Sequence, residues 1–310
     1  MNLANLDFLK LDPRYFKAFV AAAEYENFSL AATEAAMTQS GISQHISKLE
    51  EQLGVALFMR SSKATMLTIE GKTLLAYIRT YNDSIAKLMD SMHKERKLVE
   101  GIVGYAMPPS CLLSPHFPML LERRLQYPSL ELNVQLLPND EILPLVIDGK
   151  IDFGFVTEKV EHPLLSYRDF CDEEYILVSA TAADVEDLSS DNLLQRSYIN
   201  YPGMGVYFNY WVNFFMPESK HISNRSLHHA GEINSIEGAI HMVAGGLGIA
   251  VFPRHCVQHL VDDGKLHVYQ DEQKGALLNR IHIVSRNSPE LPTRVSTVVQ
   301  WFMDMQNTDH

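Results

Sequence analysis

The sequence predicts a mixed α/β protein with a small helix-rich N-terminal domain, a long connecting helix and a larger C-terminal domain of two α/β lobes. Its 310 residues are enough for about two domains. Amphipathic helical stripes fill the first hundred residues, whereas helix and strand patterns alternate after residue 100, which is typical of a mostly parallel sheet. Charge divides the chain at the same place, because residues 1–100 hold 12 basic and 12 acidic residues whereas residues 101–310 hold 14 and 26.

The composition excludes several classes of protein. Hydrophobic residues make up 46% of the chain, which is enough for folded cores and excludes a disordered protein. The net charge of −12 opposes a nucleic-acid partner for the whole chain, but the acidic excess lies after residue 100. Three separated cysteines without a CxxC pair suit a reducing cytoplasm, and we expect neither a signal peptide nor a membrane span.

Three helices are expected before residue 54. Asp12, followed by proline, suits the N-cap of a first helix with an apolar stripe. Ser29 is a candidate cap for a second helix over residues 30–36. A short turn ending at Thr38 precedes a third helix, and the buried side of that helix is predicted to consist of Ile42, Ile46 and Leu49.

The other face of the third helix carries short polar side chains. Its residues are Gln39, Ser40, Gly41, Ser43, Gln44, Ser47 and Lys48. Small side chains allow a helix to enter the DNA major groove, where Gln and Ser can bond base edges and phosphates. The pattern therefore indicates a helix-turn-helix, and the alternative is an ordinary helical hairpin with a solvated polar face.

A basic hairpin is predicted directly after the third helix. Gly54 can end the helix, the segment Arg60 to Lys63 has the composition of a hairpin tip, and residues 66–68 can form the returning strand. A basic hairpin beside such a helix is typical of a wing that contacts phosphates or the minor groove. This element favours the DNA-binding interpretation over the plain hairpin.

A long helix is expected from Gly71 to about Glu95. Apolar residues recur along it at alternating spacings of four and three, as in a coiled-coil seam. They are Leu74, Ile78, Tyr81, Ile85, Leu88 and Met92. We expect this seam to pair two copies of the chain, and the alternative is a helix packed on its own domain.

The C-terminal domain offers three candidate ligand loops. Expected strands include Ile102–Ala106, Leu130–Leu136, Asp152–Val156, Tyr175–Ser179, Ser197–Tyr201, Ile249–Phe252 and Arg280–Val284, and expected helices include 115–126, 140–149, 206–215, 235–244 and 292–305. Ligands of such sheets bind at the carboxyl ends of strands. The loops are 107–111, 200–204 and 231–235, and the alternative for each is ordinary turn chemistry.

Enzymatic motifs are absent from the sequence. It has no GxSxG, HExxH, P-loop or zinc-type Cys/His spacing. His255 and His259 stand at i and i+4 without an evident third metal ligand, so we expect neither a metal nor a cofactor. The sequence predicts a regulator, and the competing classes are a solute-binding protein and a cytosolic enzyme with a helical appendage.

The N-terminal segment resembles LysR-type transcriptional regulators. The run from Phe28 to Arg60, followed by Leu67-Thr68 and Gly71, is similar to that family's signature almost position by position. The resemblance implies a winged helix-turn-helix in which Gln39, Ser40, Ser43, Gln44 and Arg60 meet DNA. Two departures, Gln44 in place of a common Arg or Lys and a wing with Ala64 and Met66, imply few phosphate contacts and a shallow salt dependence. The full predicted DNA-binding set is Ser29, Thr38, Gln39, Ser40, Gly41, Ser43, Gln44, Lys48, Arg60 and Lys63.

The C-terminal half resembles the effector-binding domain of the same family. The stretch Gly246-Leu247-Gly248-Ile249 to Pro253 is similar to a family motif, as are Leu125 to Pro128 and Asp148 to Asp152. The resemblance implies a periplasmic-binding-protein-like fold of two lobes, with crossings near Cys171 and Tyr269. The predicted effector cleft consists of Ser110, Cys111, Thr157, Tyr201, Gly203 and Asn234. Cys111 is expected there as a small buried thiol, and the alternative is an oxidant sensor.

The resemblance also implies an organisation and a set of partners. Residues 1–70 would form the DNA-binding domain, 71–98 the dimerisation helix, and 99–310 the effector-binding domain, with lobe one at 101–170 and 269–310 and lobe two at 171–268. The partners would be double-stranded promoter DNA, a small-molecule effector and RNA polymerase. The effector could be an anion, because the helix that begins after Ser110 offers N–H groups at its N-terminus. The chain itself would form homodimers or homotetramers through residues 72–95, without a membrane partner.

Overall fold

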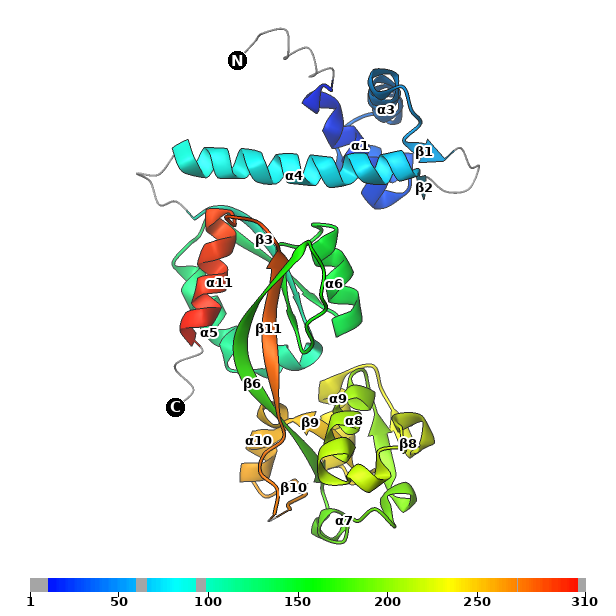
Figure 1. Cartoon of the computed structure of the whole chain (residues 1–310), viewed down its shortest axis with the longest axis vertical. Helices are drawn as coiled ribbons and strands as arrows, with labels where there is room; N and C mark the ends of the chain where they lie inside the picture. Colours follow the sequence, from blue (N-terminus) through cyan, green and yellow to red (C-terminus); the bar gives the residue numbers. More distant parts are fainter. Residues whose placement is uncertain (1–10, 60–65, 93–98, 272, 306–310) are drawn as a thin grey trace. The chain divides into compact units, whose positions relative to one another are not determined.

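The computed structural model describes residues 11–59, 66–92, 99–271 and 273–305. The chain divides into two compact units, residues 1–94 and 95–310, and Figure 1 shows a helical first unit and an α/β second unit. The expected mixed α/β class with a helix-rich N-terminal part is confirmed.

The first unit is three short helices, a two-stranded hairpin and a long helix. A 3-10 turn at Pro13–Tyr15 leads into α1 (Phe16–Tyr25), and α2 (Phe28–Glu34), α3 (Gln39–Leu53), β1 (Phe58–Met59), β2 (Met66–Leu67) and α4 (Ile69–Met92) follow. The apolar sides of the helices meet in one core, which includes Phe19, Ile42, Ile46 and Leu49. The predicted helical stripes therefore form the inside of this unit.

Side-chain caps fix where these helices begin. The Asn27 side chain accepts the N–H groups of Ser29 and Leu30 at 2.9 and 3.1 Å, so Asn27 caps α2 and Ser29 lies inside the helix. The prediction that Ser29 is the cap is wrong, because the asparagine two residues earlier already occupies that role. The expected ends of α3 are confirmed, since Thr38 caps its start and Gly54, with a φ of 71°, ends it.

The apolar seam of the long helix α4 is buried in its first half and exposed in its second half. Leu74 and Ile78 are buried in the core of the first unit, with 6% and 1% of their surface exposed. Further along, Ile85 and Met92 are exposed at 40% and 72%. The N-terminal half of the seam is therefore a core face of its own domain, which corrects the prediction that all of it faces a partner.

The second unit is formed by elements from β3 to α11. Its strands are β3 (Gly101–Met107), β4 (Leu130–Leu136), β5 (Phe153–Val156), β6 (Leu165–Ser179), β7 (Ser197–Asn200), β8 (His228–Glu232), β9 (Ala250–Pro253), β10 (His267–Val268) and β11 (Leu278–Arg286). Its α-helices are α5 (His116–Leu125), α6 (Asn139–Ile147), α7 (Ala182–Glu186), α8 (Met204–Phe215), α9 (Ile236–Ala244), α10 (Arg254–Asp262) and α11 (Thr293–Met305). Short 3-10 turns lie at Pro109–Leu113, Leu193–Gln195, Pro217–Ser219 and Asn224–Ser226.

Two long strands connect the two lobes of this unit. In lobe one, β3 pairs in parallel with β4 and β5, and β11 pairs antiparallel to β5. The first part of β6 runs antiparallel to β11, and its last residues pair with β9 and β10 in lobe two. Figure 1 shows β6 and β11 running together from one lobe to the other. The two-lobed fold that the sequence predicts is confirmed.

The crossings differ in detail from those expected. The strand predicted at Tyr175–Ser179 is the end of β6, which begins at Leu165. Tyr269 donates its N–H to Leu177 in lobe two at 2.9 Å, so the chain returns at about Leu278, where β11 begins, and not near Tyr269. Strand β8 and helix α10, which the sequence analysis did not include, also belong to lobe two.

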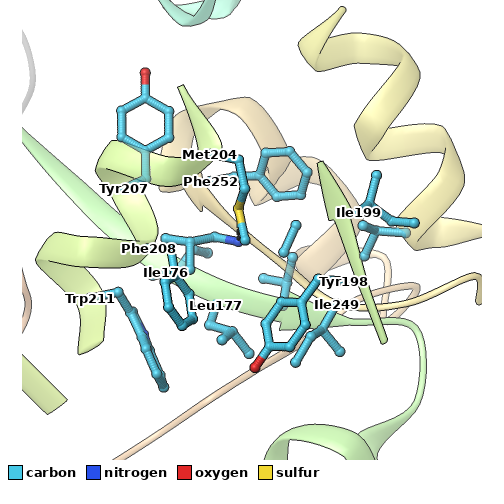
Figure 2. Close-up of a cluster of buried hydrophobic side chains, with 14 of the residues drawn as sticks. Ile176, Leu177, Tyr198, Ile199, Met204, Tyr207, Phe208, Trp211, Ile249 and Phe252 are labelled. Atoms are coloured by element: carbon cyan, nitrogen blue, oxygen red, sulfur yellow. Dashed lines mark hydrogen bonds between the residues drawn. The ribbon is translucent and has the colours of Figure 1, made fainter. Parts of the chain in front are cut away.

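Each lobe core contains a group of packed aromatic side chains among its aliphatic residues. In lobe one the rings of Tyr105 and Phe153 stack with centroids 4.9 Å apart. Figure 2 shows the lobe-two cluster, in which Phe208 and Trp211 of α8 face Tyr198 and Ile249. These clusters keep each lobe rigid around the connecting strands.

A substitution at Gly71 tests the packing of the first unit. A Cβ at this position would lie 2.2 Å from the carbonyl oxygen of Leu57, so Gly71→Ala must displace backbone. We expect a loss of about 1–3 kcal/mol in the free energy of unfolding of this unit, as for other overpacked sites. Both tryptophans, Trp211 and Trp301, lie in the second unit, so far-UV circular dichroism should report the loss while tryptophan fluorescence does not.

The matched control is Gly275→Ala, because a Cβ there meets nothing within 4 Å. It should leave both unfolding transitions in place. An unchanged circular dichroism transition in Gly71→Ala would contradict the packing of α4 described above.

Candidate nucleic-acid interface and ligand cavities

Helix α3 separates its residues cleanly into two faces. Ile42, Ile46 and Leu49 are buried, with at most 4% of their surface exposed. The exposed face consists of Gln39, Ser40, Ser43, Gln44, Ser47 and Lys48, in agreement with the sequence pattern. A row of short polar side chains on one exposed helix face has the shape and chemistry needed for the major groove.

Thr38 and Gly41 shape the start of this helix. The Thr38 hydroxyl accepts the Gly41 N–H at 3.0 Å and lies 3.1 Å from the Ser40 hydroxyl. A Cβ on Gly41 would lie 3.1 Å from the same hydroxyl, which leaves little room for any side chain. Both residues therefore have a structural role at the helix N-terminus, while Ser29 is exposed on the neighbouring α2.

The described interface carries little free positive charge. Lys48 is the one Lys or Arg in α3, and its ammonium group lies 2.6 Å from the Glu51 carboxylate. This contact raises the pKa of Lys48 and lowers the pKa of Glu51. The predicted wing residues Arg60 and Lys63 lie outside the described residues, between strands β1 and β2.

A cavity of about 520 Å³ lies between the two lobes of the second unit; we call it the interlobe cavity. Lobe one contributes the prolines after β3, the start of α6 and the end of β5. Lobe two contributes Gly203, Val206 and Tyr207 at the start of α8. A smaller hollow of about 360 Å³ lies beside Tyr201 and Asn234. Both openings follow carboxyl ends of parallel strands, where ligands of such folds bind.

The structure brings only part of the predicted effector set together. Gly203, whose φ is 102°, lines the interlobe cavity, and Tyr201 and Asn234 line the smaller hollow. Thr157 is buried, and the Asn139 amide donates to its hydroxyl at 2.5 Å. Ser110 is also buried, with its hydroxyl 3.4 Å from that of Tyr207.

Cys111 lines a different cavity from the other predicted effector residues, so its prediction as part of the same cleft is wrong. It follows Ser110 in a 3-10 turn, which directs the two side chains to different surroundings. Burial raises the pKa of the Cys111 thiol well above its ordinary value, so the thiolate is disfavoured. The surroundings are those of an unreactive thiol.

The charge of the interlobe lining is negative. Asp140 and Glu158 line the interlobe cavity and Glu232 lines the smaller hollow, while no Lys or Arg is among the described residues of either. The Tyr210 hydroxyl donates to Glu158. This lining suits a neutral or cationic ligand better than the anion that the helix N-terminus suggested, and the charge of the effector stays a prediction.

Sequence reasoning missed several lining residues. Asn139 and Asp140 open α6, at the start of the helix predicted over 140–149, so their position after a strand was a usable signal. Val206 and Tyr207 lie in the first turn of α8, where the sequence offers only an apolar helix and no sign of a cavity.

Neither a metal site nor a membrane span is found in the described part of the chain. No group of three or more His, Cys, Asp or Glu residues there could hold a metal ion. His255, one of two histidines at helical spacing, donates from Nε2 to the Ser110 carbonyl at 3.0 Å. None of the described helices is both long and apolar enough to cross a bilayer.

Comparison with known proteins gives a consistent result. Residues 13–72 match the model described as bacterial regulatory helix-turn-helix protein, lysR family, and residues 105–307 match that of the LysR substrate binding domain. The HTH-type transcriptional regulator CzcR of Bacillus cereus is 25% identical over 283 residues, which cover 90% of this chain and 92% of CzcR.

Two solved structures share the fold. ArgP from Mycobacterium tuberculosis has a TM-score of 0.71 at 17% identity, covering 96% of this chain and 97% of its own. Full-length CbnR, solved in complex with its target DNA, has a TM-score of 0.58 at 17% identity and covers 96% of this chain and 100% of its own.

The hydroxyl of Tyr201 allows a test of its role. It is buried and donates to the Val251 carbonyl at 2.6 Å, so this bond ties Tyr201 into the lobe-two core. Tyr201→Phe should lower the free energy of unfolding of the second unit by about 1–2 kcal/mol, because a buried carbonyl loses its partner. Urea unfolding followed by tryptophan fluorescence measures this loss.

Tyr210→Phe is the matched control, since its hydroxyl donates to the exposed Glu158. It should cost less than about 0.5 kcal/mol. Equal losses in the two variants would show that the Tyr201 bond does not stabilise the lobe.

Proposed function

Because this chain belongs to the LysR family of bacterial regulatory helix-turn-helix proteins, we propose that α3 reads DNA and that an effector in the interlobe cavity changes how paired subunits present it. The chain is a DNA-binding transcriptional regulator with an effector-binding domain, and not an enzyme. The observation that carries the DNA assignment is the exposed polar face of α3 opposite three buried apolar residues.

Four side chains on α3 are proposed to contact the base edges and phosphates. Gln39 and Gln44 can each form two hydrogen bonds with an adenine edge, and Ser40 and Ser43 can bond bases or phosphates. The Lys48–Glu51 pair leaves few cations for phosphates, so binding should depend weakly on salt. Arg60 and Lys63 of the wing are proposed to supply further phosphate contacts.

Self-association is proposed through the exposed end of α4. Tyr77, Ile85, Leu88 and Met92 expose between 40% and 72% of their surface, which is unusual for large apolar side chains in one helix. Pairing through residues 72–95 would place two α3 helices on two half-sites of a promoter, with residues 1–70 as the DNA-binding domain and 99–310 as the effector-binding domain.

The proposed effector response depends on the two lobes. A ligand shifts an equilibrium only by the difference in its affinity for the two states, so the effector must bind one lobe arrangement better than another. The interlobe cavity is lined from both lobes, so its ligand contacts depend on their arrangement. We propose a neutral or cationic effector, promoter DNA as the macromolecular partner, and RNA polymerase as the partner through which transcription responds.

Substitutions on α3 test the DNA assignment. Gln39→Ala and Gln44→Ala should each weaken binding to the chain's own promoter DNA by about 1–3 kcal/mol, or roughly 5- to 150-fold, and relax the sequence preference. Fluorescence anisotropy at two salt concentrations measures both the affinity and the salt slope. Gln126→Ala, an exposed glutamine in the second unit, is the matched control.

Wild-type affinity in both α3 variants would contradict the proposal that α3 contacts the DNA bases. A loss in Gln126→Ala of the same size would show that the effect does not come from the interface.

Substitutions at the end of α4 test self-association. Ile85→Glu and Met92→Glu place charges on the exposed apolar surface, so we expect the chain to dissociate to monomers and to bind promoter DNA at least tenfold more weakly. Light scattering after size-exclusion chromatography measures the mass. Leu194→Glu, exposed at 48% in lobe two, should leave the mass unchanged, and an oligomer that persists in both α4 variants would contradict this interface.

A further inference from the structure

A second cavity lies where the connecting strands leave lobe one; we call it the hinge cavity. Its volume is about 670 Å³, which is in the range of small-molecule sites. It is separate from the interlobe cavity, since the described residues that line the two are different. Of the predicted effector residues, Cys111 alone is among its described lining residues, and the proposed effector response does not involve it.

One side of the hinge cavity is apolar and aromatic. Phe155, Phe170 and Phe302 are at least 96% buried, and their rings contact one another with centroids 4.8–6.0 Å apart. Met107 and Ile281 complete this wall. The surface suits a flat apolar or aromatic body of a small ligand.

The opposite side carries a buried carboxylate. Glu173 of β6 lines the hinge cavity with 5% of its side chain exposed. The nearby Arg254 guanidinium is already bonded to Glu174 at 2.9 Å, and within the described part of the chain no Lys or Arg forms an ion pair with Glu173. His255 approaches it with Nδ1 at 3.8 Å, beyond hydrogen-bond distance. A buried acid without a close cation is costly to ionise.

We propose that the hinge cavity binds a small primary amine with an aromatic or apolar body, its ammonium group pairing with the Glu173 carboxylate and its body lying on the phenylalanine wall. The amine supplies a permanent cation closer to the carboxylate than the His255 ring at 3.8 Å, and burial from water strengthens the pair. An organic acid would instead bring a second negative charge beside Glu173 and Glu174.

The cavity also adjoins the regulator's effector site. His255 beside Glu173 donates to the Ser110 carbonyl, and the Ser110 hydroxyl lies 3.4 Å from Tyr207, which lines the interlobe cavity. Figure 2 shows the Tyr207 hydroxyl directed away from the lobe-two cluster. A ligand bound to Glu173 is therefore linked to the interlobe cavity through the contacts of His255, Ser110 and Tyr207.

The proposed contact predicts how binding varies with pH. Burial raises the pKa of Glu173 to about 7, although a hydrogen bond with Tyr175 lowers it in part. The titratable groups that face Glu173 are His255 and Cys256 of α10, Cys111, Tyr175 of β6, Tyr201, and Tyr207 of α8. Burial raises the pKa of these thiols and phenols, so they stay neutral near pH 7. An ammonium ligand selects ionised Glu173, so its affinity should rise with pH.

Three probes with one body and different heads test the proposal on the full chain. They are 2-phenylethylamine, 2-phenylethanol and phenylacetate, titrated by calorimetry at pH 6 and pH 8. At pH 8 we expect the amine to bind at least tenfold more tightly than the alcohol, and phenylacetate to bind most weakly. Lowering the pH to 6 should weaken the amine about tenfold, since Glu173 becomes protonated, and leave the alcohol unchanged.

Glu173→Gln keeps the size of the side chain and removes its charge. It should reduce amine affinity at least tenfold, to the level of the alcohol, and abolish the pH dependence without changing alcohol affinity. The matched control is Glu158→Gln, the same change in the interlobe cavity, which should leave amine affinity as it is. Tryptophan fluorescence confirms that both variants fold.

Several outcomes would overturn the proposal. They are equal affinities for amine and alcohol in the unmodified chain, no binding of any probe at millimolar concentration, or a loss of amine affinity in Glu158→Gln and not in Glu173→Gln. The last outcome would place the amine in the interlobe cavity and would leave the proposed regulator function intact.

Discussion

The antiparallel pairing of β6 with β11 is the interaction on which the second unit depends. The two strands pair from Leu165 opposite Arg286 to Glu174 opposite Leu278, with one irregularity between Arg280 and His282. Beyond this pairing, β6 continues into lobe two. Each lobe has its own aromatic core, so the strand pair determines which groups of the two lobes can meet.

Exposed ion pairs lie along β6 and β11. Arg280 pairs with Asp172, and Lys159 pairs with Asp169 at 2.7 Å. Such pairs contribute little to stability because water screens them, about 0–1 kcal/mol each. Their main consequence is a polar sequence in the first part of β6, in which Leu165, Phe170 and Glu173 are the buried residues. Strand β6 thus has charged side chains on its exposed side and still directs the Glu173 carboxylate into the hinge cavity.

Secondary structure and burial can be predicted well for an element that packs on a single core with one face. They are predicted poorly for an element whose neighbours change along its length. Helix α3 and the strand over Leu130–Leu136 follow their periodicity, because a single core fixes which residues face inward. The first part of β6 does not alternate regularly, since its neighbours bury Phe170 and Glu173, three residues apart, and leave Cys171 half-buried and Asp172 exposed between them. Along α4 one heptad stripe faces two environments, and the sequence contains no sign of where the change occurs.

The candidate sites show the same limit. The exposed face of α3 could be predicted in full, because exposure follows directly from the buried stripe. The ligand cavities could not, because they require tertiary geometry: Ser110 and Thr157 follow strands as expected, yet both are buried and bonded to side chains from distant segments. Neighbouring residues in one turn, Ser110 and Cys111, face different surroundings, which no periodicity reveals.

Gly203 constrains how ligand preference can diversify in proteins built on this plan. Its φ of 102° suits glycine, and a Cβ there would lie 3.0 Å from the Tyr207 ring. Any other residue at position 203 would strain the backbone and crowd Tyr207, so this part of the interlobe cavity lining tolerates little change. Val206, which is 44% exposed, borders the same cavity and has room to change, whereas the Asn139 amide is held by its hydrogen bond to the buried Thr157. Laboratory evolution toward a new ligand of this proposed site should therefore begin at Val206, with glycine retained at 203.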